Sequence, residues 1–158
     1  MANQRSAIHM TDAEVTAMLA AGRKVQLATL GPGGYPHLVA MYYALVHGRI
    51  AFWTYRRSQK ALNLARDPRI TCLVESGQAY FDLRGVQVQG VVETITDPDK
   101  VYQLGLRIGT VMAEGLAGDE PVAVDTMNEY VAKAARKRNA YIVEPQRIIS
   151  WDHAKLLS

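Results

Sequence analysis

Apolar residues recur with a period of two over much of the chain, which is the spacing of half-buried strands. Residues 24–30, KVQLATL, alternate between apolar and polar positions, and the turn sequence GPGG separates them from a second apolar run at 35–46. Two such runs joined by a short glycine-rich turn are typical of a hairpin. The pattern therefore predicts that these two segments pair as antiparallel strands.

Further segments with strand character follow, and most of them are joined by short turns. They lie at 49–55, 69–75, 79–95 and 140–152. The segment 79–95 is long enough for two strands or for one strand bent at Gly85 or Gly90. The last segment is interrupted near Pro145, which cannot donate to a strand ladder. The chain thus offers five or six strands before residue 96 and one more near its end.

Four segments have the spacing of helices. Residues 11–22, TDAEVTAMLAAG, begin with a Thr–Glu capping box and end in glycine. Ser58 is placed to cap a shorter helix that runs to about Arg66. A third helix begins at Pro98, with apolar residues at 101, 104, 108 and 111, and a fourth extends over about 124–137.

These elements predict a mainly β protein with flanking helices, of the α+β class. Strands joined by tight turns, with few helices between them, favour an antiparallel sheet closed into a barrel with the helices packed outside. A chain of 158 residues without repeats or long linkers is predicted to form one domain, residues 1–158.

The distribution of charge changes this picture more than the net charge of +3 does. No Asp or Glu occurs from Val15 to Arg66, whereas this stretch holds seven cations: Arg23, Lys24, Arg49, Arg56, Arg57, Lys60 and Arg66. Arg56, Arg57 and Lys60 surround a helix start that is already partly positive, so each cation there costs about 0.3–1 kcal/mol unless an anion is bound. The sequence leaves two interpretations open, a phosphate site and a solvated basic surface.

Conventional catalytic and metal sites find little support. His9, His37, His47 and His153 lack neighbours at metal-ligand spacing, so no metal site is predicted. The turn GPGG lacks the Lys and Ser/Thr of a phosphate-binding loop. In SWDH, neighbouring residues of a strand point to opposite faces, so Ser150, Asp152 and His153 are not expected to form a catalytic triad. The single cysteine, Cys72, fits a buried hydrophobe in a reducing compartment. No secretory signal or membrane-length apolar run is present, so we expect a cytoplasmic protein.

The order of the motifs resembles a known family. The segments ATLGPGGYPHLVAMYYAL, GRIAFWTYRRSQKALNLARDPRITCLVE, LRGVQVQGVVETI and PQRIISWDHAKL follow one another as in the pyridoxamine 5′-phosphate oxidase-like split-barrel proteins, which bind flavins or deazaflavins. The string KALNLARDPR looks like the lysine-bearing helix of the actinobacterial branch that binds the deazaflavin coenzyme F420. The similarity extends over nearly the whole chain.

The resemblance implies a homodimer of six-stranded split barrels with the cofactor in a groove at the dimer interface. Lys60 and Ser58 match the helix that holds the cofactor phosphate, with Arg56 beside them and Asn63 one turn later. Arg57 faces either solvent or an oligoglutamate tail. The remaining implied cofactor contacts come from two strands, whose residues are Thr54, Tyr55, His37, Val39, Ala40, Met41 and Tyr42. Tyr80 and Gln87 are candidates to reach the partner subunit's cofactor.

The implied function is hydride transfer between reduced coenzyme F420 and an electron-poor small molecule. No catalytic residue is certain, and His37 is the candidate proton donor. Two alternatives stay open: an FMN-dependent oxidase or reductase, and a non-catalytic binder of haem or another cofactor. The basic segment ARKRN, residues 135–139, permits nucleic-acid binding, but no recognition motif accompanies it and this partner is not expected.

Overall fold

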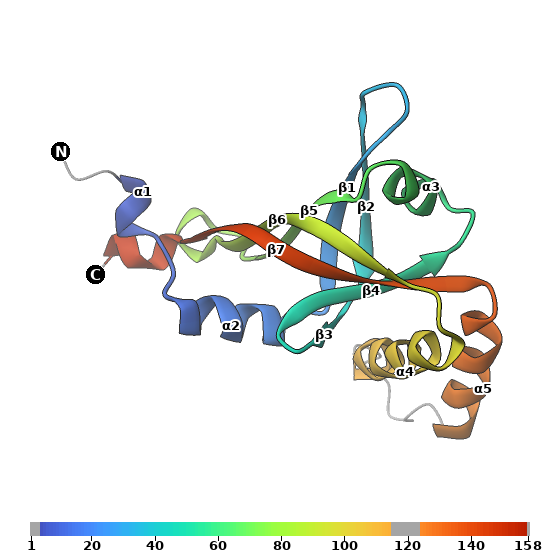
Figure 1. The fold of residues 1–158 in the computed structure, drawn as a ribbon. Coiled ribbons are helices and arrows are strands. Elements are labelled where there is room, and N and C mark those ends of the chain that lie inside the picture. The colour runs from blue at the N-terminus through green and yellow to red at the C-terminus, as the bar shows by residue number, and fades with distance from the viewer. Residues whose placement is uncertain (1–3, 115–123, 158) are drawn as a thin grey trace.

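The computed structural model describes residues 4–114 and 124–157, which form one curled antiparallel sheet with flanking helices (Figure 1). The strands are β1 (Lys24–Leu30), β2 (Pro36–Tyr42), β3 (Ala44–Val46), β4 (Arg49–Tyr55), β5 (Arg69–Ser76), β6 (Arg84–Ile95) and β7 (Arg138–Asp152). Their order in the sheet is β2-β1-β5-β6-β7-β4-β3. The α+β class predicted from the strand and helix patterns is confirmed.

The helices are α1 (Gln4–Ala7), α2 (Asp12–Ala21), α3 (Gln59–Arg66), α4 (Pro98–Glu114) and α5 (Val124–Ala135), with 3-10 turns η1 (Tyr80–Asp82) and η2 (His153–Leu157). The capping box predicted for α2 is present, because the Thr11 hydroxyl accepts from the Glu14 amide and the Glu14 carboxylate accepts from the Thr11 amide. The segment 115–121, GLAGDEP, which the sequence marks as a loop, lies outside the described residues.

The sheet has seven strands where the family resemblance implies six. The sequence predicts a single strand over 35–46, but Tyr43 interrupts it and leaves β2 and β3 as separate strands. The phenol of Tyr43 is buried and donates a 2.5 Å hydrogen bond to the carbonyl of Leu19 at the end of α2. Its amide donates to the carbonyl of Arg23. This anchoring fixes the bend between the two strands.

Tyr43 also determines how the sheet closes. Strands β2 and β3 are the two edges of the sheet, and they are consecutive in the chain. The prediction of a barrel closed by its strands is therefore wrong in detail. Among the described residues, the edges are joined through Tyr43 and not by a ladder, so the sheet is a curled half-barrel.

The long segment 79–95 forms one strand, β6, preceded by the turn η1. Its pairing with β7 shifts register between Gln89 and Gly90, where Gln146 of β7 is left without a partner next to Pro145. A side chain at Gly90 would collide with the carbonyl of Glu144, so glycine is required for this close approach. Of the alternatives predicted for 79–95, the structure has one strand that is irregular at Gly90 and not at Gly85. Together with the interruption near Pro145, this irregularity forms one bulge shared by β6 and β7.

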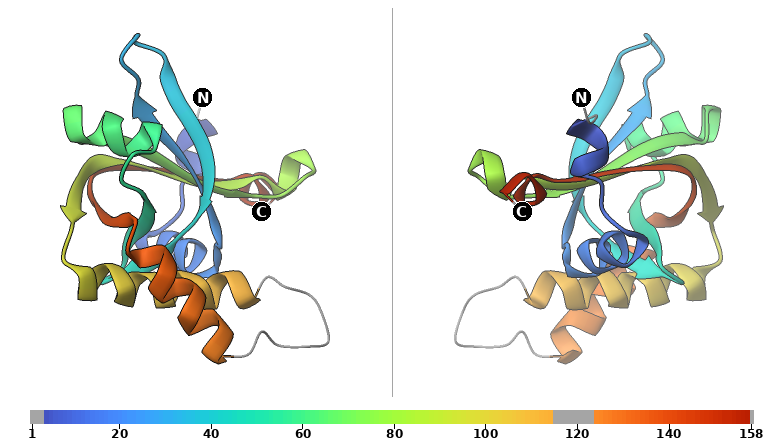
Figure 2. Two further views of the ribbon diagram at one scale, coloured as in Figure 1. Left: turned by 90° about the vertical axis from the view of Figure 1, so that its right-hand side faces the viewer. Right: turned by 90° about the vertical axis from the view of Figure 1, so that its left-hand side faces the viewer.

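Two apolar cores lie on opposite sides of the sheet. The first is enclosed by the curled sheet, α2 and α3, and its largest members include Leu27, Phe52 and Tyr141. The second lies between β4, β7 and the helix pair α4 and α5, and it centres on Trp53, Leu104 and Ile108. Figure 2 shows these two helices stacked beneath the sheet, away from α3. The two cores therefore hold β4 from both sides.

Candidate functional site

The site is built at the start of α3, which follows directly from the end of β4. The Ser58 hydroxyl accepts a 3.3 Å hydrogen bond from the Ala61 amide and lies 3.1 Å from the Thr54 hydroxyl. The Ser58 carbonyl accepts from the Leu62 amide. The first amides of a helix have no acceptor inside the helix. The amides of Gln59 and Lys60 donate no hydrogen bond to any group in the part of the chain that the structure describes. Two donors and a hydroxyl thus meet at one point.

A second segment of the chain completes the basic surface. Strand β4 pairs with β7, which places Arg138 directly opposite Tyr55. The Arg56 amide donates to the Lys137 carbonyl, and the Arg56 Nε donates a 3.2 Å hydrogen bond to Asn139 Oδ1. Cations that are far apart in sequence, Arg56 and Lys60 on one side and Lys137 and Arg138 on the other, therefore lie around the same helix start.

The guanidinium of Arg138 lies over two aromatic rings. Its Cζ atom is 4.7 Å from the ring centroid of Trp53 and 4.1 Å from that of Tyr55. Such cation–π contacts stabilise a cation and fix its orientation. Tyr55 is exposed while Trp53 is buried in the second core, so Arg138 bridges the core and the surface.

Lys60 is partly buried close to this guanidinium. Burial, and to a smaller extent the charge of Arg138, lowers the pKa of the Lys60 ammonium below its ordinary value. None of the ion pairs formed among the described residues involves Lys60 or Arg138. The fold thus holds two cations together without a carboxylate of the protein between them.

The structure brings five of the predicted site residues together at the end of β4 and the start of α3: Thr54, Tyr55, Arg56, Ser58 and Lys60. Arg57 lies in the same turn and is exposed.

Asn63 lies one turn further into α3, as expected, but its side chain is fully buried. It donates to Thr29 of β1 at 3.0 Å and accepts from Gln59 at 2.8 Å. A third contact comes from Arg66. The side chain of Asn63 thus joins α3 to the sheet and also contacts Gln59, the first residue of the helix.

The other predicted contacts lie on β2, an edge strand whose outer backbone groups have no strand partner among the described residues. His37 pairs in register with Thr29, and its Nδ1 is buried without a hydrogen-bond partner in the described structure. Val39 and Met41 pack against the first core and Tyr42 against the second, whereas Ala40 is exposed. The side chains of Val39, Met41 and Tyr42 are therefore used in packing, whereas the outer backbone edge of β2 is not used in the sheet.

Sequence reasoning missed Arg138. The segment ARKRN was interpreted only as a basic stretch, because nothing in its local pattern shows which strand it meets. The pairing of β4 with β7 supplies that information, since it places Tyr55 opposite Arg138.

A separate hollow lies on the sheet near the β1–β2 hairpin. A cavity of about 420 Å³ is lined by residues of β1, β2, β5, β6 and β7, among them Thr29, Pro36, Arg69, Gln89 and Gln146. The residues at the start of α3 do not line it. Among residues 4–114 and 124–157, no group of three or more His, Cys, Asp or Glu could hold a metal ion, and no helix is long and apolar enough to cross a membrane.

Comparison with known families identifies this arrangement. A family described as pyridoxamine 5′-phosphate oxidase matches residues 11–152, which include both strand segments and the α3 helix start. The chain belongs to the pyridoxamine 5′-phosphate oxidase family. No protein among those of curated function matches it at a significant level.

Solved structures agree with the family. The conserved hypothetical protein Rv2991 from Mycobacterium tuberculosis is 38% identical, with a TM-score of 0.85, covering 99% of this chain and 93% of that one. A protein described as an F420 reductase is 23% identical, with a TM-score of 0.61 and coverage of 84% and 93%. The heme storage protein HutZ from Vibrio cholerae is 13% identical, with a TM-score of 0.62 and coverage of 90% and 97%. At such identities the last two show a shared fold.

In this member of the pyridoxamine 5′-phosphate oxidase family, neither Ser58 nor Cys72 has an activating base among the described residues. Within the described residues, the Ser58 hydroxyl forms hydrogen bonds with the Thr54 hydroxyl and with the Ala61 amide that it caps. Cys72 is fully buried, and burial raises the pKa of its thiol to about 12.

Proposed function

We propose that the protein is an oxidoreductase that uses coenzyme F420 to transfer a hydride to or from an electron-poor small molecule. The observation that carries this proposal is the pair Lys60 and Arg138, two cations at a capped helix start to which no carboxylate of residues 4–114 and 124–157 is paired. A phosphate there would accept from the first-turn amides and neutralise both cations.

The residues present fit the phosphate of a flavin or deazaflavin coenzyme. Ser58 caps the helix through its oxygen, so its hydroxyl proton is available to an acceptor when it is not directed to Thr54. The amides of Gln59 and Lys60 add two donors at the positive end of the helix dipole. An anion in this place would accept hydrogen bonds from these donors and would also remove the repulsion between Lys60 and Arg138. A water molecule could accept the hydrogen bonds but could not remove the repulsion.

Two observations favour F420 over FMN. The exposed Arg57 and the basic residues Arg136 and Lys137 extend the positive surface beyond the phosphate position, as the oligoglutamate tail of F420 requires. The structure also shares its fold with a protein described as an F420 reductase. FMN has no such tail and would leave this outer surface unused.

The reduced coenzyme supplies the hydride, and the protein residues bind, orient and exclude water. Strand β2 offers unpaired backbone groups along one edge of the sheet, which suits contact with a flat polar ring. Among the buried side-chain nitrogen and oxygen atoms of the described residues, Nδ1 of His37 is the one that lacks a hydrogen bond. His37 is therefore the candidate to hold or donate a proton. His37→Gln, which keeps a hydrogen-bonding group but cannot titrate, is expected to lower turnover more than coenzyme affinity.

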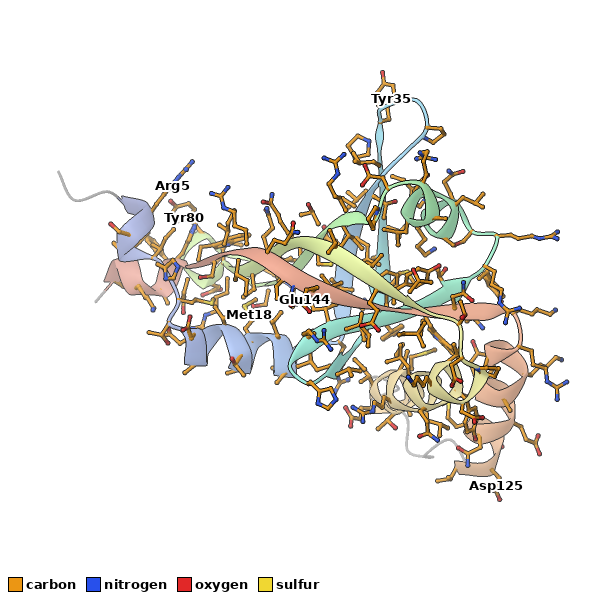
Figure 3. The ribbon with its side chains drawn as sticks, in the orientation of Figure 1. Arg5, Met18, Tyr35, Tyr80, Asp125 and Glu144 are labelled. Carbon is orange, nitrogen blue, oxygen red and sulfur yellow. The ribbon has the colours of Figure 1, made fainter. Side chains whose placement is uncertain are left out.

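We also propose that the protein acts as a homodimer with the coenzyme groove at the interface. The hairpin of β1 and β2 exposes Leu30, Tyr35 and Leu38, and Figure 3 shows Tyr35 at its tip. Tyr80 and Gln87 remain the candidates to reach the partner subunit's coenzyme. Exposed apolar side chains grouped in this way are typical of protein interfaces. Light scattering coupled to size exclusion tests this point, and a monomer at micromolar concentration would contradict it.

Fluorescence titration of the purified protein with F420 and with FMN tests the proposal. We expect tight F420 binding that weakens with salt and a weaker, less salt-sensitive binding of FMN. Lys60→Gln should weaken F420 binding by about tenfold to hundredfold, the effect of losing one charged hydrogen bond. Lys100→Gln, an exposed lysine at the start of α4, serves as the matched control and should bind as the wild type does.

The alternative coenzyme is FMN, which the family description favours because pyridoxamine phosphate oxidases resemble this chain in motif order. A protein that purifies yellow and prefers FMN would keep the anion site and change the enzyme class.

The activity itself is tested with reduced F420, which should be consumed when an enone or a quinone is added. If the protein binds F420 but does not oxidise it with any such substrate, the protein is a coenzyme carrier and the proposal of an enzyme is contradicted. Binding of haem in place of both coenzymes would overturn the proposal.

A further inference from the structure

We propose that Arg138 is a coenzyme-binding residue that shares one phosphate group with Lys60, so that a single anion ties β7 to the start of α3. The inference rests on the proposed function and adds a residue to the same site. Sequence motifs place the phosphate only on the segment from Thr54 to Lys60. The structure adds a cation from a second segment of the chain.

The position of Arg138 follows from the pairing of two strands. Arg138 is the first residue of β7, and it lies opposite Tyr55, the last residue of β4. Helix α3 is capped by Ser58 only a short turn later, and the Ser58 amide donates to the Tyr55 carbonyl. Tyr55 thus contacts both the helix start and the guanidinium, which brings the two cationic segments to one place.

The orientation of the guanidinium leaves its donors free. An aromatic ring covers a guanidinium through its face, whereas the N–H groups point outward in the guanidinium plane. The Cζ atom of Arg138 lies over the rings of both Trp53 and Tyr55. No ion pair or side-chain hydrogen bond is assigned to its N–H groups in the described part of the chain. A planar fork of donors is therefore presented without an acceptor, and this geometry suits a phosphate oxygen pair.

Electrostatic repulsion gives an independent reason for a shared anion. Arg138 is close enough to Lys60 to oppose its protonation, and the nearest segments contribute further cations at Arg56 and Lys137. Two like charges held together by the fold destabilise the ligand-free protein. A phosphate between them converts this repulsion into two attractions, so each cation should increase the effect of the other on binding.

The second core holds Arg138 in place before any ligand binds. Trp53 is 6% exposed and packs against α4, where Gly105 leaves room for its ring. A guanidinium stacked on a rigid ring loses little freedom on binding, which favours affinity. This explains how the helix pair α4 and α5 contributes to a site on the other side of β4.

The first experiment uses inorganic phosphate as the probe. Thermal unfolding of the wild type, Arg138→Gln, Lys60→Gln and Arg147→Gln is compared with and without phosphate at constant ionic strength. Arg147 is an exposed arginine on the same strand β7 and is the matched control. A ligand that binds only the folded state raises the melting temperature. We expect phosphate to raise it for the wild type and Arg147→Gln, and not for the other two variants.

The second experiment is a double-mutant cycle on coenzyme affinity. Arg138→Gln and Lys60→Gln should each weaken binding by about tenfold to hundredfold, as expected for loss of a charged hydrogen bond. The double variant should lose clearly less than the product of the two, because the cations act on one anion. Losses that multiply would mean that Arg138 binds a different group, and an Arg138→Gln variant with wild-type affinity would mean that it binds none. Either result overturns the inference.

The two experiments separate this inference from the proposed function. A phosphate response that depends on Arg138, without binding of F420 or FMN, supports the shared anion and refutes the oxidoreductase. Tight coenzyme binding that Arg138→Gln does not change supports the oxidoreductase and refutes the shared anion. If the protein shows neither a phosphate response nor coenzyme binding, both proposals are refuted. If Arg138→Gln does not fold, Arg138→Lys takes its place: it keeps the charge but loses the fork, and undiminished phosphate and coenzyme binding would contradict the assigned geometry.

Discussion

Asn63 donates a 3.0 Å hydrogen bond from its side-chain amide to the hydroxyl of Thr29, and both side chains are almost completely buried. The contact joins α3 to β1, the strand that the half-barrel brings opposite β4. Because the contact is made one turn after Ser58, it fixes the direction in which the helix start points. Asn63 thus supports the anion site from behind.

Replacing Asn63 by Ala should lower the free energy of unfolding by about 1–3 kcal/mol, because Thr29 would keep a buried hydroxyl without its partner. Urea denaturation measures this change. Gln59→Ala removes an exposed partner of Asn63 and is the control, with an expected change within about 0.5 kcal/mol. Equal stability of the two variants would show that the buried contact contributes little.

Gly105 on α4 is the next test, because its Cβ would lie 2.5 Å from Cζ3 of Trp53 and 2.8 Å from Cγ1 of Val131. Gly105→Ala should destabilise the protein by about 1–3 kcal/mol through overpacking, against a gain in helix propensity of about 1 kcal/mol. Gly109→Ala on the same helix would place its Cβ 3.0 Å from Sδ of the flexible Met127 and 3.4 Å from Cγ2 of Val131, and it should be close to neutral. Calorimetry compares the two, and a stabilised Gly105→Ala variant would contradict the close packing of Trp53.

The ion pair of Glu14 with Lys155 predicts a loss of stability in acid. Lys155 and the Thr11 amide hold the pKa of Glu14 down to about 2, from an ordinary value near 4.5. A lowered pKa in the folded state gives stability that is present above the ordinary pKa and is lost as the pH falls toward the folded value. Stability should therefore decline between about pH 5 and pH 2.

Comparison of Glu14→Gln with the wild type over this range isolates the contribution of Glu14, since Arg69 lowers the pKa of Asp67 to about 2 in the same window. The difference in melting temperature between the two proteins should shrink as the pH falls from 5 to 2. Glu129→Gln, which changes an exposed carboxylate on α5, should show a constant difference. A constant difference for Glu14→Gln as well would exclude the pair from acid stability.

Cys72 should react very slowly in the native protein. Burial raises the pKa of its thiol from 9.0 to about 12, so at pH 8 the thiolate fraction falls by about a thousandfold. Labelling with a chromogenic disulfide should therefore be slow in buffer and fast in denaturing urea. Rapid labelling in buffer would show that β5 opens easily at this position.

The local signals in the sequence predicted the elements that depend on neighbours along the chain. The capping box at Thr11 and the cap at Ser58 are each made within one helical turn, so residue identity alone determines them. The hairpin of β1 and β2 follows from GPGG for the same reason. The sequence could place the residues of the proposed anion site on the segment 54–60 close together because that segment is itself continuous.

What the sequence could not predict depends on pairing between distant segments. The break at Tyr43 requires the carbonyl of Leu19, and the fixed guanidinium of Arg138 requires the rings presented by β4. The apolar periodicity predicted one continuous strand through Tyr43, because periodicity shows which face of a strand a residue lies on and does not show which distant residues contact it. The burial of Asn63 was missed for the same reason.

The interruption at Tyr43 has a consequence for how the chain acquires its shape. The hairpins β1–β2 and β3–β4 each close over a short loop, and they share one continuous segment at Tyr43, so both can form from contacts close in sequence. The ladders that β7 makes with β4 and β6 span much longer loops and are slower to close. The anion site, which needs β7, should therefore be the last part of the molecule to form. Pulse-labelling hydrogen exchange during refolding should protect the amides of β1 and β2 before those of residues 138–143.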